Sequence, residues 1–361
     1  MKELNKLRAM VRKIDGEIIN LISKRIDITK KIGAKKKEEG MALRNWEIEK
    51  MAMDNAEKVA GELGLSPHLI RPVMQQLILE SRIQQELHHY SAYTGSKVDI
   101  LIIGGLGEMG RWFSYFFQNQ GHNVFIYDIK GKSDEFKSYA SLEEAVREVS
   151  FVLVATTLDE VPLMIDSVVE LDYKKVIFDA ASLKSHLKDS IENARKRGVA
   201  ITSIHPMFGP NARTLSDKVI CLCDCGVSEA NKKVEGLFKD TAASIVKISL
   251  KEHDRVISYV LGLSHLLNII FIKSLMGGGY AYNELKSFGS TTFLSQIVTA
   301  ESVMKENPYL YYAIQRLNPL QQELYDSFKQ ASDFVIKTVA QGKGKEFISI
   351  MEEGKQWLEG K

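Results

Sequence analysis

The feature that most constrains the fold is a glycine-rich turn, GGLGEMG, at residues 104–110. An apolar strand pattern, KVDILII, precedes the turn, and a helical pattern, RWFSYFFQNQG, follows it. Gly105, Gly107 and Gly110 form the pattern G-x-G-x-x-G, and the next strand pattern, NVFIYD, ends in Asp128. This order of strand, turn, helix and acidic strand end is typical of dinucleotide-binding domains. The residues before the turn need a separate explanation.

The glycine motif predicts how a dinucleotide would bind. The first two glycines permit a tight turn and let the backbone approach the pyrophosphate at the N-terminus of the following helix. Asp128 would accept hydrogen bonds from the ribose hydroxyls and would repel a 2′-phosphate, so the sequence favours NAD over NADP. We expect the cofactor-binding residues to be Gly105, Gly107, Glu108, Met109, Gly110, Asp128 and Thr156.

Strand and helix patterns continue to alternate after this motif. We predict strands at 151–156, 175–180 and 199–204, with helical segments between them. The pattern indicates a doubly wound sheet of parallel strands, which binds ligands at the carboxyl ends of the strands. Two of these ends carry polar motifs, DAASLK at 179–184 and HPMFGP at 205–210. Pro206 holds His205 extended in a stiff loop, which suits a general base, although a lone histidine at a strand end is also often structural.

The first ninety residues have a different, all-helical pattern. Apolar residues recur at spacings of three, four or seven, which predicts one long amphipathic helix: Leu4, Leu7, Val11, Ile14, Ile18, Leu21, Ile28 and Ile32. Two shorter helices are predicted at Asn45–Ala60 and at 66–89, and Pro72 should kink the latter or delay its start. Three helices of this kind bury little core alone, so we expect a helical dimer.

Charge is concentrated in the first helix. Residues 1–37 contain twelve Lys and Arg but only four Asp and Glu, which fits a nucleic-acid arm, a site for a small anion, or a solvated face. Arg25 and Lys36 lie within the apolar stripe, where a cation needs an anionic partner or must extend past a helix end. The third helix has a stripe that becomes polar: Met74, Ile78, Ser81 and Gln85.

Composition places the chain among soluble globular proteins. Its 361 residues are 45% hydrophobic and 26% charged, which predicts two or three domains. We find no apolar run of the roughly 18–20 residues that a membrane span needs and no signal-peptide core, so we expect a cytoplasmic protein with no membrane partner. The apolar segment at 258–276 is predicted to be a buried helix. Cys221, Cys223 and Cys225 are expected to be buried on a strand, and no metal site is expected.

The first segment resembles the all-helical chorismate mutase family. Three motifs carry the resemblance: LRAMVRKIDGEIINLISKRIDITKKIGAKK, LRNWEIEK and LILESRIQQ. The resemblance implies an intertwined dimer that rearranges chorismate to prephenate, with roles for seven residues. Arg25 and the partner's copy of Arg8 would bind the two carboxylates, Lys36 and Gln85 the ether oxygen, Glu49 and Asn45 the hydroxyl side, and Ser81 a carboxylate. This chain departs from the family at Ile48, where Arg is common, and at Asn45, where Asp is common.

The rest of the chain resembles the prephenate dehydrogenase family. GGLGEMGR, DAASLKS and HPMFGPN occur in the family's order, and EHD at 252–254, His265 and NPYLY at 307–311 also fit. The resemblance implies oxidative decarboxylation of prephenate, with His205 taking the proton from the ring hydroxyl and Ser182 orienting His205. His253 and His265 would lie near the substrate. Ser302 stands where the family has a carboxylate-binding Arg, which leaves prephenate and arogenate open as substrates.

These patterns predict a multidomain, bifunctional enzyme of tyrosine biosynthesis. We expect an all-α mutase-like domain at 1–92, an α/β Rossmann-like NAD domain at 97–249 and an all-α substrate and dimerisation domain at 250–361. The expected state is a homodimer that binds no nucleic acid and carries no further regulatory domain. Two alternatives stay open: a dehydrogenase whose helical module is non-catalytic, and a hydroxyacid-type dehydrogenase with a basic nucleic-acid arm. The cations on the apolar stripe argue against both.

Overall fold

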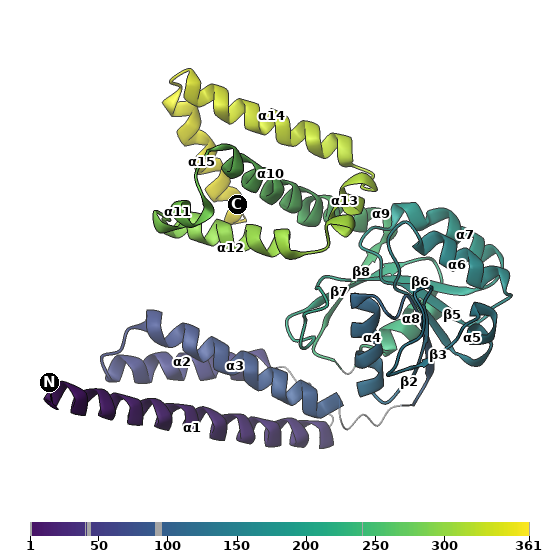
Figure 1. Cartoon of the computed structure of the whole chain (residues 1–361), viewed down its shortest axis with the longest axis horizontal. Coiled ribbons are helices and arrows are strands. Elements are labelled where there is room, and N and C mark those ends of the chain that lie inside the picture. The colour runs from purple at the N-terminus through teal and green to yellow at the C-terminus, as the bar shows by residue number, and fades with distance from the viewer. Residues whose placement is uncertain (1, 40, 42–44, 91–95, 240, 361) are drawn as a thin grey trace. The chain divides into compact units, whose positions relative to one another are not determined.

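The computed structural model describes residues 2–39, 41, 45–90, 96–239 and 241–360 (Figure 1). The chain divides into two compact units. The first contains the N-terminal helices and the sheet: Met1–Thr156, Glu160–Ala181 and Asp189–Ile248. The second contains the C-terminal helices together with two short loops: Thr157–Asp159, Ser182–Lys188 and Ser249–Lys361. The predicted domain boundary at residue 92 lies outside the described residues.

Three helices form the N-terminal part of the first unit: α1 (Lys2–Glu38), α2 (Trp46–Glu62) and α3 (Pro67–Tyr90). Both α1 and α2 pack against α3. Pro72 lies inside α3 and does not delay its start, because the helix already begins at Pro67. The apolar stripe of α1 is exposed in the single chain, with Ile18 at 50% and Leu21 at 63%. The predicted long amphipathic helix is therefore present, but one chain does not cover its apolar face.

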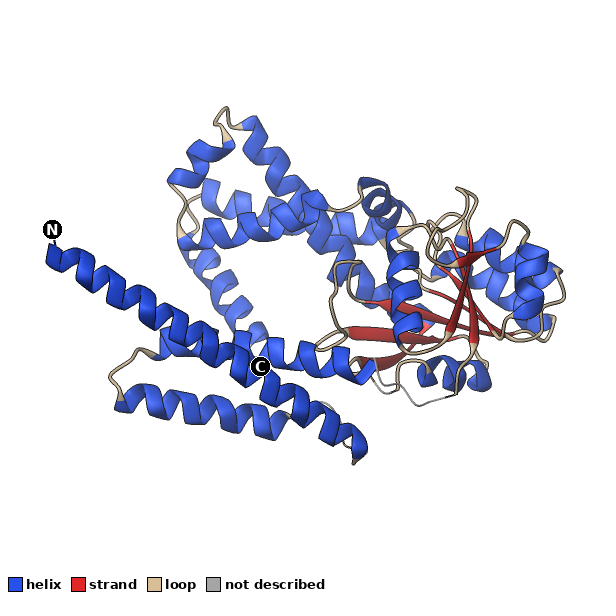
Figure 2. Cartoon of the chain, turned by 60° about the horizontal axis from the view of Figure 1, so that its bottom comes forward, coloured by secondary structure: helices blue, strands red, loops and turns tan. Residues whose placement is uncertain are grey.

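The rest of the first unit is built around an eight-stranded sheet (Figure 2). Its strands are β1 (Asp99–Ile103), β2 (Asn123–Tyr127), β3 (Lys137–Ser138), β4 (Phe151–Val154), β5 (Val176–Asp179), β6 (Ala200–Pro206), β7 (Val219–Asp224) and β8 (Ser244–Ser249). The order is β3-β2-β1-β4-β5-β6-β7-β8, and the pairs from β3 to β6 are parallel. The predicted strands at 151–156, 175–180 and 199–204 are parallel as expected. Strand β7, whose direction was not predicted, runs antiparallel to β6. The short connection from β6 to β7 contains no crossover helix, which a parallel pair would need.

Helices accompany the sheet in the expected alternation: α4 (Glu108–Asn119), α5 (Leu142–Glu148), α6 (Val161–Glu170), α7 (Lys188–Lys196) and α8 (Ser228–Gly236). The core consists of apolar strand residues with large aromatic side chains between sheet and helix, such as Phe113, Phe117 and Phe178. Strands β4 and β5 are buried along their whole length, which explains their continuous apolar runs. The three cysteines are buried and unbridged, as expected, although Cys225 follows the end of β7.

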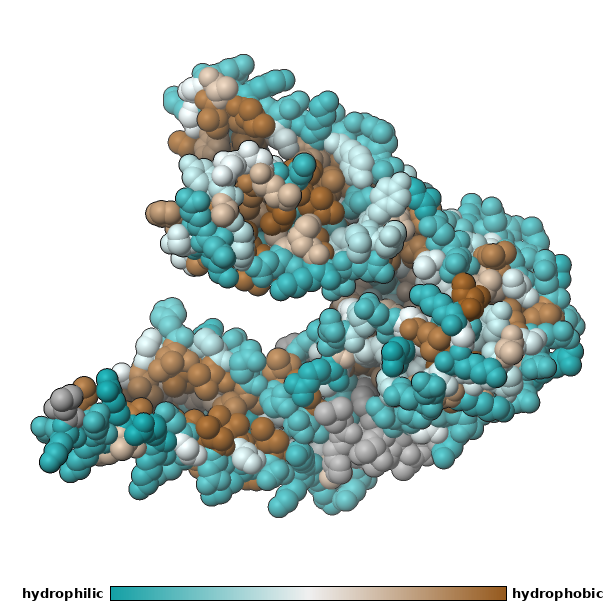
Figure 3. All heavy atoms as spheres, in the orientation of Figure 1, coloured by the Kyte–Doolittle hydropathy of each residue, from teal (hydrophilic) through white to brown (hydrophobic). Residues whose placement is uncertain are grey.

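The second unit is helical: α9 (Leu250–Ile257), the π-helical segment η2 (Ser258–Leu263), α10 (Ser264–Gly277), α11 (Tyr282–Ser287), α12 (Thr291–Lys305), α13 (Pro308–Arg316), α14 (Gln321–Ala340) and α15 (Gly344–Leu358). The prediction of a buried helix at 258–276 is wrong for a single chain. Leu250–Gly277 forms one helix that by length and composition alone could cross a membrane, so the expectation that the chain has no apolar run of this length is also wrong. Only 28% of its most apolar window is buried. Contacts with α12 and α14 cover part of it, and apolar patches stay exposed on both helical regions (Figure 3).

Candidate active sites

The N-terminal helices bring Arg25 and Ser81 together. Arg25 Nη1, on α1, donates to the Leu77 carbonyl at 2.8 Å and to Ser81 Oγ, both on α3. Ser81 is 4% exposed and donates its own proton to the Leu77 carbonyl. Burial lowers the pKa of the Arg25 guanidinium. These partners are neutral, so the site holds a partly buried cation with capacity for an anion.

Gln85, Lys36 and Glu49 extend the same cluster. Gly33, on α1, is buried against α3, and a Cβ there would lie 2.9 Å from Gln85 Cγ. The absence of a side chain at Gly33 lets the two helices approach at Gln85. Burial lowers the pKa of Lys36, and the negative charge of Glu49 opposes this effect, so the ammonium and the carboxylate are within electrostatic range. Three helices thus supply one polar cluster.

Arg8 lies far from Arg25 along α1, and the side chain of Asn45 caps a helix. Arg8 precedes Arg25 by seventeen residues of continuous helix, about 26 Å at 1.5 Å per residue. Asn45 is the N-cap of α2, where its side-chain oxygen accepts from the backbone N–H groups of Glu47 and Ile48 at 3.1 Å each. The side chain of Ile48 is 59% exposed. The predicted substrate contacts of Arg8 and Asn45 stay predictions.

The glycine turn joins β1 to α4 with a geometry that only glycines allow. The left-handed residue is Gly104 (φ 84°), so the tight turn begins one residue earlier than the motif predicted. A Cβ on Gly110 would lie 2.1 Å from the Gly104 carbonyl oxygen, and a Cβ on Gly105 would meet Ile126 at 2.7 Å. Gly107, the N-cap of α4, is less crowded, with its nearest atom at 3.2 Å.

The residues around this turn fit a dinucleotide. The Leu106 N–H donates to Asp128 Oδ2 at 3.0 Å, so the acidic residue lies beside the turn. Thr156 follows β4, and its buried hydroxyl has no hydrogen-bond partner among the described residues. A helix N-terminus without a side-chain cap, at Gly107, leaves backbone N–H groups available to phosphate. Glu108 and Met109 form the first turn of that helix.

The two polar strand ends begin at neighbouring positions of the sheet. Asp179, the last residue of β5, pairs with Ser203 of β6, and His205 follows two residues later. His205 is 4% exposed and pairs in register with Cys221 of β7. Ser182 follows β5 and belongs to the second unit. The roles predicted for Ser182 and His205 stay predictions.

Asp254 anchors the loop that carries Ser182. Its carboxylate accepts the backbone N–H of Lys184 at 2.8 Å and that of Ser185 at 2.6 Å, and it bonds His253 Nδ1 at 2.8 Å. Burial raises the pKa of Asp254, but these hydrogen bonds outweigh it and lower the pKa overall. His253 is 0% exposed, and its ring nitrogen Nδ1 contacts the Asp254 carboxylate. The EHD motif led to a predicted role for His253 but to none for Asp254. The backbone N–H group of Lys184, which Asp254 binds, lies seventy residues earlier in the chain.

His265 lies in an aromatic contact in the second unit. Its ring stacks on Tyr311 of the NPYLY segment, with 4.0 Å between centroids. Burial lowers the pKa of His265 to about 4, so the ring is neutral at physiological pH. Ser302, at the position of the family's Arg, is exposed on α12 and donates to the Thr299 carbonyl.

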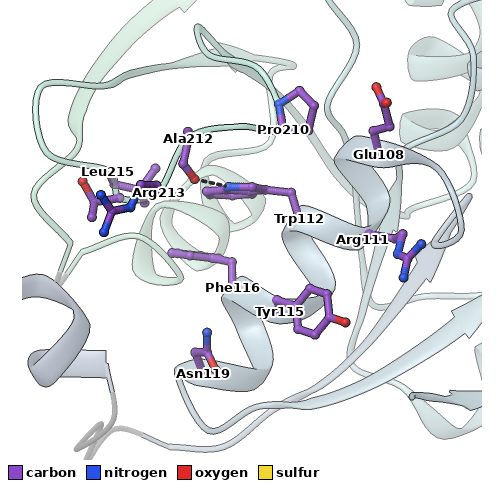
Figure 4. Close-up of a pocket in the computed structure, with 11 residues that line it drawn as sticks. Glu108, Arg111, Trp112, Tyr115, Phe116, Asn119, Pro210, Ala212, Arg213 and Leu215 are labelled. Atoms are coloured by element: carbon purple, nitrogen blue, oxygen red, sulfur yellow. Dashed lines mark hydrogen bonds between the residues drawn. The ribbon is translucent and has the colours of Figure 1, made fainter. Parts of the chain in front are cut away.

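A pocket of about 370 Å³ lies between α4 and the loop after β6 (Figure 4). Trp112 lines it and donates from Nε1 to the Ala212 carbonyl at 2.8 Å. Glu108 and Pro210 also line it, so the pocket neighbours both the glycine turn and the HPMFGP loop. Glu108 is one of the residues predicted to bind the dinucleotide, whereas neither Asp128 nor His205 contributes to the lining.

The glycine turn, the acidic residue beside it and the doubly wound sheet define a dinucleotide-dependent dehydrogenase joined to an all-helical domain. Three families match the chain in this order: chorismate mutase type II at residues 7–86, the prephenate dehydrogenase nucleotide-binding domain at 118–247 and the prephenate dehydrogenase dimerisation domain at 249–353. One chain thus carries matches to a mutase family and to both domains of a dehydrogenase family, and the predictions of a fused enzyme and of NAD as its cofactor are confirmed.

Curated relatives include proteins that match along nearly the whole chain. T-protein of Enterobacter agglomerans is 22% identical over 99% of this chain and 93% of its own length. T-protein of Haemophilus influenzae is 21% identical with the same coverage. A probable arogenate/prephenate dehydrogenase of Methanocaldococcus jannaschii is 29% identical over 72% of this chain and 60% of its own length.

Solved structures share the fold of the dehydrogenase part. Prephenate dehydrogenase from A. aeolicus, in complex with hydroxyphenyl propionate and NAD+, has a TM-score of 0.60 and 17% identity, and covers 73% of this chain and 97% of its own. Arogenate dehydrogenase from Synechocystis has a TM-score of 0.56 and 13% identity, and covers 72% and 98%. The sheet and the C-terminal helices thus have the architecture of this class of dehydrogenase.

Proposed function

We propose that this chain catalyses two successive steps of tyrosine biosynthesis. The helical domain rearranges chorismate to prephenate, and the remaining domains oxidise and decarboxylate prephenate to 4-hydroxyphenylpyruvate with NAD. The observation that carries the proposal is the polar cluster formed by α1, α2 and α3, because a purely structural helical module has no use for partly buried Arg25 and Lys36. The same cluster argues against the non-catalytic module, and its inward cations argue against a nucleic-acid arm.

The helical site suits a rearrangement that needs neither a nucleophile nor a general base. Arg25 and Ser81 would hold a substrate carboxylate in a fixed orientation. Lys36 and Gln85 would donate to the ether oxygen, where negative charge develops as the bond breaks. Glu49 would accept a hydrogen bond from the substrate hydroxyl group. Such a site accelerates the reaction by clamping one conformer and stabilising the developing charge.

The dehydrogenase site depends on the two strand-end motifs. His205 would take the proton of the ring hydroxyl, and Ser182 would orient its imidazole ring. NAD, when bound at the glycine turn, would supply the hydride acceptor. The Asp254 carboxylate holds the Ser182 loop through two backbone N–H groups, and His265 would contribute a neutral ring to substrate binding. Loss of CO2 makes the ring aromatic, which favours product formation.

We propose prephenate as the preferred substrate of the second step. The first step produces prephenate on the same chain, which supports this choice. Ser302 stands where the family has an Arg that binds a substrate carboxylate. That carboxylate would instead be bound by Lys286 of α11, by Lys305 of α12, or by a residue of a partner subunit. The ratio of kcat/KM for prephenate and arogenate tests the choice, and a higher value for arogenate would reject it.

We propose a cytoplasmic homodimer. The exposed stripe of α1 and the exposed face of Leu250–Gly277 support it, since both are apolar and a second copy would cover them. The dimerisation-domain family of residues 249–353 supports the same state. A monomer by analytical ultracentrifugation, or full-length protein in the membrane fraction of lysed cells, would contradict this proposal.

Two substitutions separate the two activities. Arg25→Ala should lower mutase kcat/KM at least a hundredfold while NADH production from prephenate is kept, because it removes a charge used only in the helical site. His205→Asn should lower NADH production a hundredfold or more and leave both NAD binding and mutase turnover intact. Lys24→Ala, exposed beside Arg25, and His68→Asn, exposed on α3, are the matched controls. Normal mutase turnover in Arg25→Ala would reject the helical site.

A further inference from the structure

Arg82, on α3, lies between two carboxylates of the first unit. Its Nε is 3.6 Å from Glu49 Oε1 on α2, and its Nη1 forms an ion pair with Asp217 Oδ2, which belongs to the loop between β6 and β7. The side chain of Arg82 is 15% exposed and that of Glu49 is 21% exposed, so solvent screens the first contact only in part. A planar guanidinium with several N–H donors can hold two carboxylates at once.

The backbone around Asp217 is held in place by the same helix. Leu215–Lys218 forms a turn in which the Lys218 N–H donates to the Leu215 carbonyl at 3.0 Å, and Asp217 has a left-handed conformation (φ 61°). Glu86, one helical turn after Arg82, accepts the N–H groups of Leu215 at 2.6 Å and Ser216 at 3.0 Å. Glu86 is 0% exposed, so this contact is fully desolvated. Helix α3 therefore fixes the turn that presents Asp217 to Arg82.

Glu49 has a second cation within electrostatic range. Burial lowers the pKa of Lys36, and the Glu49 charge opposes that effect. If Glu49 paired closely with Lys36, the ammonium would have less positive charge to offer the ether oxygen of the substrate. An ion pair with Arg82 competes with that pairing. A single cation at position 82 thus affects both the orientation of Glu49 and the charge available from Lys36.

We infer that Arg82 is a positioning residue for the mutase reaction and that Asp217 orients it, so that a residue of the nucleotide-binding domain completes the mutase site. The inference rests on the proposed mutase function, because Glu49 acts in that site. It gives the contact between α3 and the 215–218 turn a role in catalysis in addition to joining two domains.

Full-length Asp217→Asn is the sharpest test, because asparagine also tolerates the left-handed conformation and has the same size. Its mutase kcat/KM should fall about fivefold, with NADH production from prephenate unchanged.

Arg82→Gln should lower mutase kcat/KM about tenfold or more, and Arg82→Lys should recover part of that loss. Arg82→Gln and Arg82→Lys should differ in mutase kcat/KM even where their thermal stabilities match. A contact that only stabilises the fold would not produce this difference.

Adding Asp217→Asn to Arg82→Gln should change mutase kcat/KM less than twofold, because Asp217 acts through Arg82. The matched control is Arg71→Gln, which removes an ion pair between α3 and α2, Arg71 to Glu57 at 2.7 Å, and should leave mutase kinetics unchanged. Additive losses, or normal mutase kinetics in both single variants, would overturn the inference. If Arg25→Ala abolishes mutase turnover while Arg82→Gln is normal, only this inference fails. If wild-type protein makes no prephenate, the proposed function fails first.

Discussion

Gly33 of α1 packs closely against Gln85 of α3, a member of the polar cluster. A Cβ at this position would lie 2.9 Å from Gln85 Cγ and 3.3 Å from Gln85 Cα, closer than ordinary contacts allow. The Gln85 backbone belongs to a helix and cannot shift without moving its neighbours. Glycine in a helix interior costs roughly 0.5–1 kcal/mol relative to alanine, so its presence here indicates a need for close packing.

Gly33→Ala should therefore lower mutase kcat/KM about tenfold or more, although alanine is the better helix former. The added methyl group displaces Gln85 from the position where it would donate to the ether oxygen. Gly16→Ala, also on α1, is the control and should keep normal kinetics, because a Cβ at Gly16 would meet no atom within 4 Å. Steady-state mutase assays check both variants. Equal activity of the two would show that Gln85 position is unimportant.

His265 should make stability depend on pH in one direction. Its pKa is about 4 in the folded protein and about 6.5 in the unfolded chain. Between these values the unfolded chain binds a proton that the folded protein does not, so the contribution of His265 lowers the free energy of unfolding as pH falls from about 6.5 to about 4. Above this window its contribution is constant.

The loss of thermal stability between pH 7 and pH 5 should accordingly be smaller in His265→Gln than in the wild-type protein. A His265 ring resonance that titrates near pH 4, identified by its absence in the variant, provides a direct check. His68→Gln, at an exposed position, should show the wild-type loss. A midpoint near 6.5 for His265 would contradict the prediction.

At the scale of elements, the spacing of residues within a segment predicted the helices, strands and turn that form from that segment alone. The glycine turn, the strands from β1 to β6 and the length of α1 follow from spacing that lies within one segment. The direction of β7 was missed because it depends on how the chain returns after β6, which no periodicity encodes. Arg82, Glu86 and Asp254 were missed for a related reason: their partners lie far along the chain, and each residue resembles an ordinary charged helix residue in the sequence.

The apolar segment at 258–276 shows a different limit of sequence reasoning. Its composition correctly predicted a long helix, but a helix that is apolar all round has no single face that reveals its partner. In one chain, α12 and α14 cover only part of it. The sequence therefore predicted that the helix is buried, but not whether residues of the same chain or of a second chain cover it.

At the scale of the whole molecule, one anionic metabolite connects the parts. The polar cluster proposed as the mutase site lies on α1, α2 and α3, and the proposed NAD site lies at the strand ends of the following sheet. The Leu215–Lys218 turn is attached to α3 and directly precedes β7, the neighbour of the strand that carries His205. Helix α3 is thus in direct contact, within the first unit, with the turn that precedes β7.

The distance between Arg8 and Arg25 along α1 has a consequence for mixed subunits. If each mutase site takes Arg25 from one chain and Arg8 from the other, an Arg8→Ala chain and an Arg25→Ala chain are each inactive alone. Denatured together and refolded, they would form heterodimers in which one site has both arginines and the other has neither. Since half of randomly paired dimers are mixed, about a quarter of the wild-type mutase activity should return. No recovery, with heterodimers demonstrated by differential tagging, would mean that Arg8 serves no site across the dimer.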